Sequence, residues 1–234
     1  ILNEVTGANR SQLQGYTEVF GASANVILAN PYGITCDGCG FINTPRVTLS
    51  TGTPEFTNGE VSGFDVSQGS VTVEGLGLDA SNQTYFDIIS RTAEINAEIH
   101  AQNLTIVTGQ NHVDYETNVA TKKATSTSTL PALAIDSSSL GGMYAGRIAL
   151  IATEAGVGVN VGNLAASQEG IHITADGKVV MGNTSSAQSL TVSTSDHIEM
   201  NGNHSAGKHM SLTGERIVAS NSTLVAGSEL ALTA

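Results

Sequence analysis

Four segments near the carboxyl end of the chain decide its fold: Gly170-Ile-His-Ile-Thr174, Ser189-Leu-Thr-Val-Ser193, His209-Met-Ser-Leu-Thr213 and Glu229-Leu-Ala-Leu-Thr233. Each segment alternates apolar and polar residues, which is the pattern of a strand with one buried face. The first apolar position recurs after 19, 20 and 20 residues, and the second recurs at the same intervals. These segments therefore belong to a repeat of nearly constant length.

A second pattern with the same period lies between these segments. Its apolar positions are Val179, Ile198 and Ile217, followed two residues later by Met181, Met200 and Ala219. Turn-forming pairs such as Asp176-Gly177 and Gly202-Asn203 separate the strand-like segments. A third short segment, around Ala187, Ala206 and Ala226, completes each repeat.

A fixed period favours a solenoid, because a solenoid places equivalent side chains directly above one another at about 4.8 Å. An antiparallel meander requires no such period, and a leucine-rich repeat requires fixed leucines and a helical half. We therefore predict an all-β fold, a right-handed parallel β-helix with coils of about 19–20 residues and extruded loops or hairpins. The alternative is a Ser/Thr-rich β-sandwich in which the spacings coincide.

The composition agrees with an all-β chain. Only 13% of the 234 residues are charged, which is too few to coat helical bundles, whereas 40% are hydrophobic. The formal net charge of −12 argues against nucleic-acid binding and against anionic membrane surfaces. The chain begins at Ile1 without a signal peptide and stops at Ala234 within a strand-like stretch, so we expect a fragment of a longer protein.

One turn motif and one cysteine pair lie close together near the amino end. Asn30, Pro31, Tyr32, Gly33 and Ile34 have the composition of a β-turn that joins two strands. Cys36 and Cys39 lack the second ligand pair of a zinc site and the βαβ context of a thioredoxin-like site. They form either a local disulfide or two thiols in a tight turn.

The acids and histidines do not form a recognisable catalytic or metal site. Asp87, His112 and Asp114 are conceivable catalytic groups, but the acids are scattered and no paired carboxylates recur at one coil period. His197, His204 and His209 are close in sequence, and solvated strand and corner positions explain them. Lys122 and Lys123 lie in a Ser/Thr-rich stretch that we expect to be a loop between Asp114 and Leu133. We predict no catalytic residue, no metal site and no cofactor.

Several motifs resemble a known family. The stretch Val26-Ile-Leu-Ala-Asn30-Pro-Tyr-Gly-Ile34, the bend Cys36-Asp-Gly-Cys39-Gly-Phe-Ile-Asn43 and the ending Thr48-Leu-Ser-Thr-Gly52 occur in the family's order. Further matches are Leu13-Gln-Gly15, Tyr85-Phe-Asp-Ile-Ile-Ser-Arg91 and Gly142-Met-Tyr-Ala145. The chain thus resembles the two-partner-secretion (TPS) domain of filamentous haemagglutinin and of contact-dependent-inhibition exoproteins. Tyr32 departs from the family pattern, which has a second Asn there.

The resemblance implies a non-enzymatic secretion module of a large bacterial exoprotein, secreted through the periplasm to the cell surface. Its partner would be an outer-membrane transporter that recognises the chain through periplasmic POTRA domains, and a cell-surface receptor could bind the parent protein. Asn30 to Ile34 would act either in recognition or in nucleating the β-helix. Residues 1–168 would form the secretion domain and residues 169–234 further coils, and we expect a monomer. The alternatives are an adhesin rod and a polysaccharide-cleaving β-helix.

Overall fold

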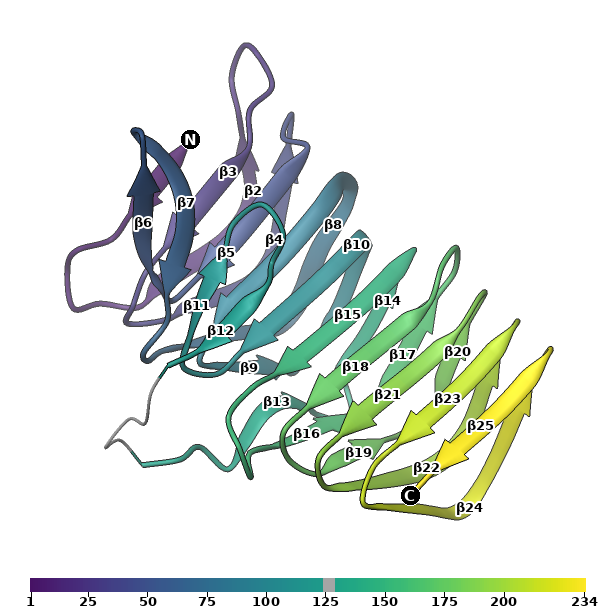
Figure 1. The fold of residues 1–234 in the computed structure, drawn as a ribbon. Coiled ribbons are helices and arrows are strands. Elements are labelled where there is room, and N and C mark those ends of the chain that lie inside the picture. Colours follow the sequence, from purple (N-terminus) through teal and green to yellow (C-terminus); the bar gives the residue numbers. More distant parts are fainter. Residues whose placement is uncertain (124–128) are drawn as a thin grey trace.

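The computed structural model describes residues 1–123 and 129–234, and within these ranges every regular element is a β-strand. Twenty-one strands join into one parallel sheet that coils from the amino end to the carboxyl end (Figure 1). Four further strands form a small antiparallel sheet. The predicted parallel β-helix is confirmed. In the described residues no helix is long and apolar enough to cross a membrane.

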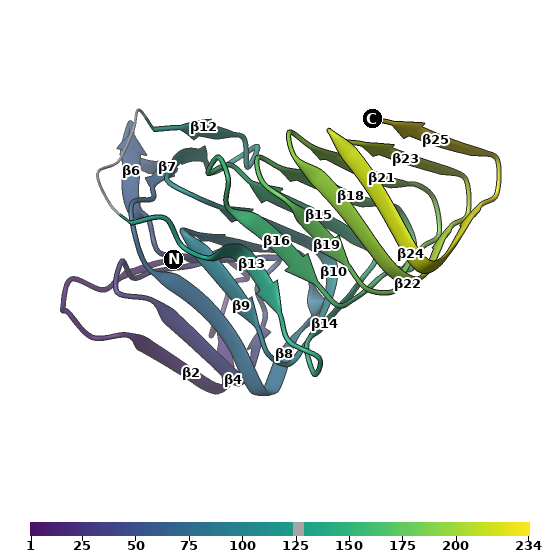
Figure 2. The ribbon, with the colours of Figure 1, turned by 90° about the horizontal axis from the view of Figure 1, so that it is seen from below.

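Each turn of the coil has three sides, which we call faces B, C and A in the order in which they follow one another from β2 onward (Figure 2). Some strands bend around a corner and serve more than one face. Face B contains the first parts of β2 (Ser11–Glu18), β4 (Ile34–Ile42), β8 (Ser70–Ser90), β22 (His197–Ala206) and β24 (Arg216–Ala226), and all of β9 (Thr92–Ile95), β13 (Leu133–Ser137), β16 (Gly158–Val161) and β19 (Val179–Met181).

Faces C and A complete the turn. Face C contains the later parts of β2, β4, β22 and β24, the middle of β8, the start of β10 (Glu98–Thr108), and β14 (Gly142–Ala145), β17 (Asn163–Ala166) and β20 (Thr184–Ser186). Face A contains the ends of β8 and β10, with β1 (Leu2–Glu4), β3 (Val26–Ala29), β5 (Arg46–Ser50), β15 (Arg147–Ala152), β18 (Ile171–Ala175), β21 (Leu190–Thr194), β23 (His209–Thr213) and β25 (Glu229–Thr233).

The repeat positions taken from the sequence are direct neighbours in the sheet. On face A the pairing runs through Ile171, Leu190, Met210 and Leu230. On face B it runs through Val179, Ile198 and Ile217. The third segment was predicted one residue out of register in one turn, because Ser186, not Ala187, pairs with Ala206. Ser186 faces the core, whereas Ala187 is exposed at the corner.

Alternation along each strand places aliphatic side chains in columns inside the coil. In β21, Leu190 and Val192 are fully buried, while Thr191 and Ser193, which alternate with them, face outward and are partly exposed. The columns merge into one core that extends from Leu28 to Leu212. Each fully buried Leu or Val contributes about 1.5–3 kcal/mol relative to an exposed one, so the stacked columns supply the main stabilisation of the rod.

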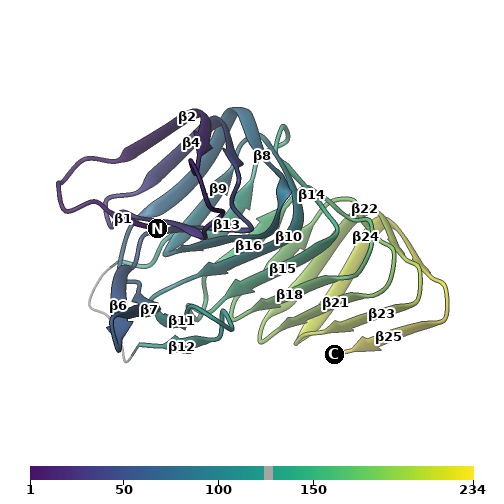
Figure 3. The same ribbon diagram turned by 90° about the horizontal axis from the view of Figure 1, so that it is seen from above.

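The small sheet interrupts the period twice. Its strands, in spatial order, are β12 (Ala120–Lys122), β11 (Asn111–Asp114), β7 (Glu60–Asp65) and β6 (Thr53–Thr57). They lie outside the coil, next to face A (Figure 3). Asn58 and Gly59 both have positive φ and form the two-residue turn between β6 and β7.

A second apolar core lies between the small sheet and face A. Phe64, Val66 and Val113 of the inserted segments pack on Ile27, Ile89 and Val107, which point outward from the coil. The loop predicted between Asp114 and Leu133 is therefore partly wrong: residues 120–122 form a strand that pairs with β11. Residues 124–128 of that loop lie outside the described residues. The stretch is polar and shows no strand pattern in the sequence. Its strand forms because residues 120–122 pair with β11.

A second prediction, that His204 is solvated, is also wrong. His204 is 1% exposed and faces the core of face C between Thr184 and Leu224. Its Nδ1 lies 2.9 Å from Thr184 Oγ1, and its Nε2 has no hydrogen-bond partner among the described residues. Burial lowers the pKa of His204 below its usual value of 6.5. At this histidine the folded chain therefore binds fewer protons than the unfolded chain just below pH 6.5.

We expect the free energy of unfolding to decrease as the pH falls through about 6.5, because the unfolded chain takes up a proton at this histidine first. The double variant Thr184→Val, His204→Leu removes the polar pair and its titration. Its stability above neutral pH should match or exceed that of the natural chain, since both partners become apolar. Urea denaturation followed by circular dichroism at several pH values tests this. An unchanged pH dependence in the double variant would contradict it.

Candidate functional site

The Asn30 side chain organises the first complete corner of the coil. It is 0% exposed, and its Nδ2 donates to Asn9 O (2.9 Å) and to Ser11 Oγ (2.8 Å) in the preceding turn. Its Oδ1 accepts from Tyr32 N (2.9 Å), and its carbonyl accepts from Gly33 N (3.0 Å). The motif is thus a β-turn, as its composition predicts, whose first side chain also binds the turn before it.

Gly33 allows the chain to turn sharply into β4. Its φ is +105°, and a Cβ atom there would lie 2.6 Å from Arg10 Nη1 and 2.9 Å from Ser70 O. No L side chain fits this position without displacing its neighbours. Ile34, directly after it, is fully buried in the core.

Arg10 fastens this corner to the turns on either side, and no sequence motif pointed to it. Its guanidinium donates to Thr35 Oγ1 (2.6 Å) and Ile34 O (2.9 Å) in β4. It also donates to Ser70 Oγ (2.9 Å) and Thr72 Oγ1 (2.6 Å) in β8. One side chain therefore links three successive turns.

The corner presents little of its motif to a partner once it has folded. Tyr32 is 46% exposed and Pro31 is partly exposed, whereas Asn30, Gly33 and Ile34 are buried. Pro31 borders a small hollow whose other lining residues, in the β5–β8 segment, include Glu55 and Asp65. A partner that contacts the folded coil can reach only the proline and tyrosine of the five residues.

Cys36 and Cys39 form a disulfide. Both face the core, where β4 bends from face B to face C, and both are buried. Asp37, on the outside of this bend, accepts a hydrogen bond from Leu76 N in the next turn (3.1 Å). The disulfide therefore fixes the bend of one turn from the inside, where a reductant cannot reach it in the folded chain.

A buried ionic cluster attaches the small sheet to the coil; we call it the Arg46 cluster and define it as Arg46, Asp87, Asn118 and Tyr115. Arg46 Nε lies 2.7 Å from Asp87 Oδ2, with side chains 12% and 2% exposed. Arg46 also donates to Tyr115 O (2.6 Å), and its guanidinium lies 4.3 Å from the centre of the Tyr115 ring. Asn118 Nδ2 donates to the other oxygen of Asp87 (2.8 Å).

The electrostatics of this cluster are those of a structural ion pair. Burial raises the pKa of Asp87, and the Arg46 guanidinium and the hydrogen bonds oppose that rise. Asp114, at the end of β11, accepts hydrogen bonds from Thr117 N and Thr117 Oγ1, which lower its pKa. Both carboxylates considered as catalytic candidates are therefore used to hold local structure.

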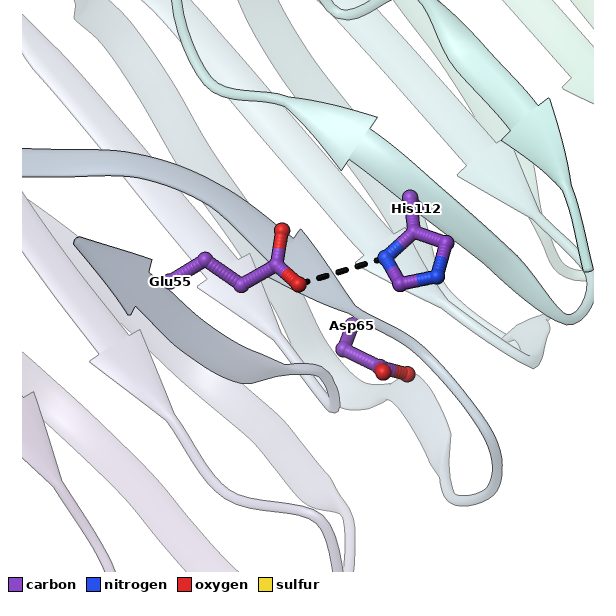
Figure 4. A group of neighbouring side chains, drawn as sticks. All are labelled: Glu55, Asp65 and His112. Atoms are coloured by element: carbon purple, nitrogen blue, oxygen red, sulfur yellow. Dashed lines mark hydrogen bonds and ion pairs between the residues drawn. The ribbon is translucent and has the colours of Figure 1, made fainter. Parts of the chain in front are cut away.

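The third candidate, His112, lies in a group that the sequence spacing did not indicate. Its Nδ1 is 3.2 Å from Glu55 Oε1, and Asp65 is close to both (Figure 4). The three side chains come from β11, β6 and β7, so only the folded small sheet brings them together. The Lys123 ammonium contacts Asp65 and donates to Ser67 Oγ, and thus supplies a positive charge to these carboxylates. Asp196, His197 and Glu215 form a similar group where β22 and β24 begin; His197 is the first residue of β22, and the two acids directly precede the strands.

A groove of about 690 Å³ separates the β11–β12 hairpin from β15 and β18 on face A. Its floor includes Ile151 and Thr174, and the Lys122 ammonium reaches across to contact Asp176. His172 also lines it, with a pKa lowered by burial and by Arg147. The groove combines apolar, acidic and basic groups, and within it Thr174 Oγ1 lies 3.0 Å from His172 Nε2.

Comparison with known proteins identifies close relatives. A model of the TPS secretion domain family matches residues 1–181. The chain is 56% identical over 182 residues to the 16S rRNA endonuclease CdiA of Enterobacter cloacae subsp. cloacae, and 53% identical over 182 residues to the tRNA nuclease CdiA of Yersinia mollaretii. Each alignment covers 77% of this chain but only 5% and 6% of the respective relative. The chain thus spans about one twentieth of the length of these relatives.

A solved structure also resembles this fold. The crystal structure of the filamentous hemagglutinin secretion domain superimposes with a TM-score of 0.74 at 29% sequence identity. The superposition covers 99% of this chain and 74% of that one. The likeness extends over both the region with the Asn30 corner and the turns that follow it.

Gly33→Ala tests the close packing of the Asn30 corner. We expect it to lower the free energy of unfolding by about 3 kcal/mol or more, since strained φ and steric overlap add. Gly156→Ala is the matched control, because Gly156 has φ +76° but no atom lies within 4 Å of the place that its Cβ would occupy. The control should lose only about 1–2 kcal/mol. Equal losses in urea denaturation would show that Arg10 and Ser70 leave room for a Cβ.

Asp87→Asn tests the Arg46 cluster. The variant leaves the Arg46 charge buried without its counter-ion, and we expect a loss of about 3 kcal/mol in unfolding free energy. In hydrogen exchange, the variant should lose more amide protection, relative to the natural chain, in β11 and β12 than in β21. Arg147→Leu removes an exposed pair with Glu169 at 3.6 Å and should cost at most about 1 kcal/mol. Comparable losses in the two variants would argue against a special role for the buried pair.

Proposed function

This chain belongs to the TPS secretion domain family, and we propose that a cognate outer-membrane transporter recognises it and thereby exports the long exoprotein that contains it. Membership in the family implies secretion and a surface location. The finer steps are our proposal: the chain crosses the periplasm, the POTRA domains of the transporter bind it there, and the β-helix forms outside the cell.

The proposed module is non-catalytic. The relatives named as nucleases are far longer than the region they share with this chain, so we assign any toxin activity of the parent to sequence outside this region. The commitment of Asp87 and Asp114 to structural contacts supports this assignment. We propose residues 1–168 as the secretion domain and residues 169–234 as further coils of the same solenoid, acting as a monomer without a cofactor.

The burial of Asn30 carries the proposed order of events. Its amide hydrogens and oxygen are all bonded within the coil, so a transporter cannot contact this side chain after folding. Before folding, the same groups and the backbone of residues 26–34 are free to pair with the edge of a partner sheet. We therefore propose that the transporter reads Asn30, Pro31, Tyr32, Gly33 and Ile34 in the unfolded chain and that the same residues then nucleate the first coils.

Asn30→Ala separates these two roles when it is compared with Asn111→Ala. Asn111 is also 0% exposed, and its side chain bonds Thr108 O and Thr153 Oγ1 at a later corner. Both variants should lose about 1–3 kcal/mol of stability, since each leaves buried polar groups without partners. We expect export of the full-length exoprotein to fall strongly only in Asn30→Ala. Secreted protein is measured by immunoblot of the medium against the cell-associated pool.

Direct binding provides the second readout. Purified POTRA domains of the cognate transporter should capture the chain when it is diluted from urea and should not capture the chain that has already folded. Equal capture of the folded rod would overturn recognition before folding. Export of Asn30→Ala at the level of the natural protein would remove the motif from recognition.

A further inference from the structure

A shallow trough lies on the outer surface of face C, on the strands β14, β17, β20 and β22. Its volume is about 540 Å³, and it spans successive turns of the coil. The described residues that line it are all uncharged. This neutrality distinguishes the trough from the mixed groove on face A.

Small side chains form the floor of the trough. Ala165, Ser185 and Ser205 occupy the same outward position in three consecutive turns. Each is paired directly with the next, so the floor is flat along the axis of the rod. The two serine hydroxyls can both donate and accept hydrogen bonds.

A ladder of asparagine amides borders the floor. Asn183 Nδ2 donates to Asn163 Oδ1 (3.1 Å), and Asn203 N donates to Asn183 Oδ1 (3.0 Å). All three asparagines are exposed. An amide NH₂ group has two hydrogens, and the ladder takes only one of those on Asn183. Ordered donors and acceptors therefore recur at the spacing of the turns, about 4.8 Å, which is close to the advance of one sugar ring in an extended glycan.

An aromatic ring closes one end of the trough. The rings of His100 and Tyr144, from successive turns, are stacked with centres 5.4 Å apart and an interplanar angle of 17°. His100 thus covers one face of the Tyr144 ring. The following turn has Ala165 at the equivalent position, so the other face of the ring borders the trough. A half-buried aromatic ring with a free face offers apolar contact beside polar groups.

We propose that this trough binds a neutral glycan, with one sugar ring against Tyr144 and its hydroxyl groups bonded to the asparagine ladder and the serine floor. The flat floor, the uncharged lining, the repeated amides and the terminal aromatic ring each fit a hydroxyl-rich, uncharged chain. An anionic glycan would gain no cationic partner here and would be repelled by the net charge of the protein. This binding is independent of the proposed export function.

Isothermal titration calorimetry of the purified chain with maltohexaose, cellohexaose and chitohexaose tests the proposal, with the hexamer of galacturonic acid as the anionic control. We expect at least one neutral hexamer to bind with a dissociation constant on the order of 1 mM or tighter. The side-chain amide signals of Asn163, Asn183 and Asn203 should shift in nuclear magnetic resonance spectra on binding.

Ser185→Arg fills the trough with a long charged side chain and should weaken binding by about tenfold or more, as should Tyr144→Ser. Tyr144→Phe keeps the ring and should stay within about threefold of the natural chain. The matched control is Ser211→Arg, because the Ser211 side chain points outward from β23 on face A, away from the trough. We expect this variant to bind with unchanged affinity. Circular dichroism verifies that each variant folds. The absence of binding to all three neutral hexamers, tighter binding of the anionic hexamer, or full binding by Ser185→Arg would each overturn the proposal.

Discussion

The structure depends on one constraint, the in-register stacking of successive turns through parallel backbone hydrogen bonds. Because each strand pairs with the strand one turn away, a side chain's neighbours are the equivalent residues of the turns before and after it. Apolar columns can then fill the inside of the coil, and corners must be compact enough to stack as well. Asn30 and Gly33 satisfy this requirement at one corner, and the Cys36–Cys39 disulfide satisfies it at the next.

Where the period holds, the sequence predicted the fold down to the register. The aliphatic positions from Ile171 to Leu232 pair as their spacing indicates, because these turns differ in length by only one residue. Ser186 was misplaced by one residue because a small polar residue occupies a position that Ala206 and Ala226 hold in the next turns. His204 was misjudged because a histidine in a polar stretch gives no sign of which face it occupies.

Contacts that cross the inserted segments could not be predicted in this way. In the Arg46 cluster, Arg46 and Asp87 are 41 positions apart in the sequence, and Asp87 and Asn118 are 31 positions apart. Neither separation equals one period of the repeat. The same holds for Arg10, whose partners lie in two later turns. The sequence motif identified the Asn30 corner, but only the folded chain shows that its first side chain is enclosed. That enclosure leaves only Pro31 and Tyr32 of the motif accessible after folding, and it is the basis of our proposal that the transporter reads Asn30 in the unfolded chain.

The small antiparallel sheet has a further consequence for the export that we propose, if the amino end of the chain leaves the transporter first. Ile27 and Ile89 leave the pore early, yet the covering strands come from two insertions, and the second ends at Lys122. Until that second hairpin has emerged, the outer surface of the partly folded coil keeps an exposed apolar strip at the position that β11 will later cover. In that order of emergence the first hairpin would cover part of this strip, and the cover would be complete only when β11 and β12 join β7, after about half of these residues have crossed. Backward movement through the pore would then require this outer layer to unfold first.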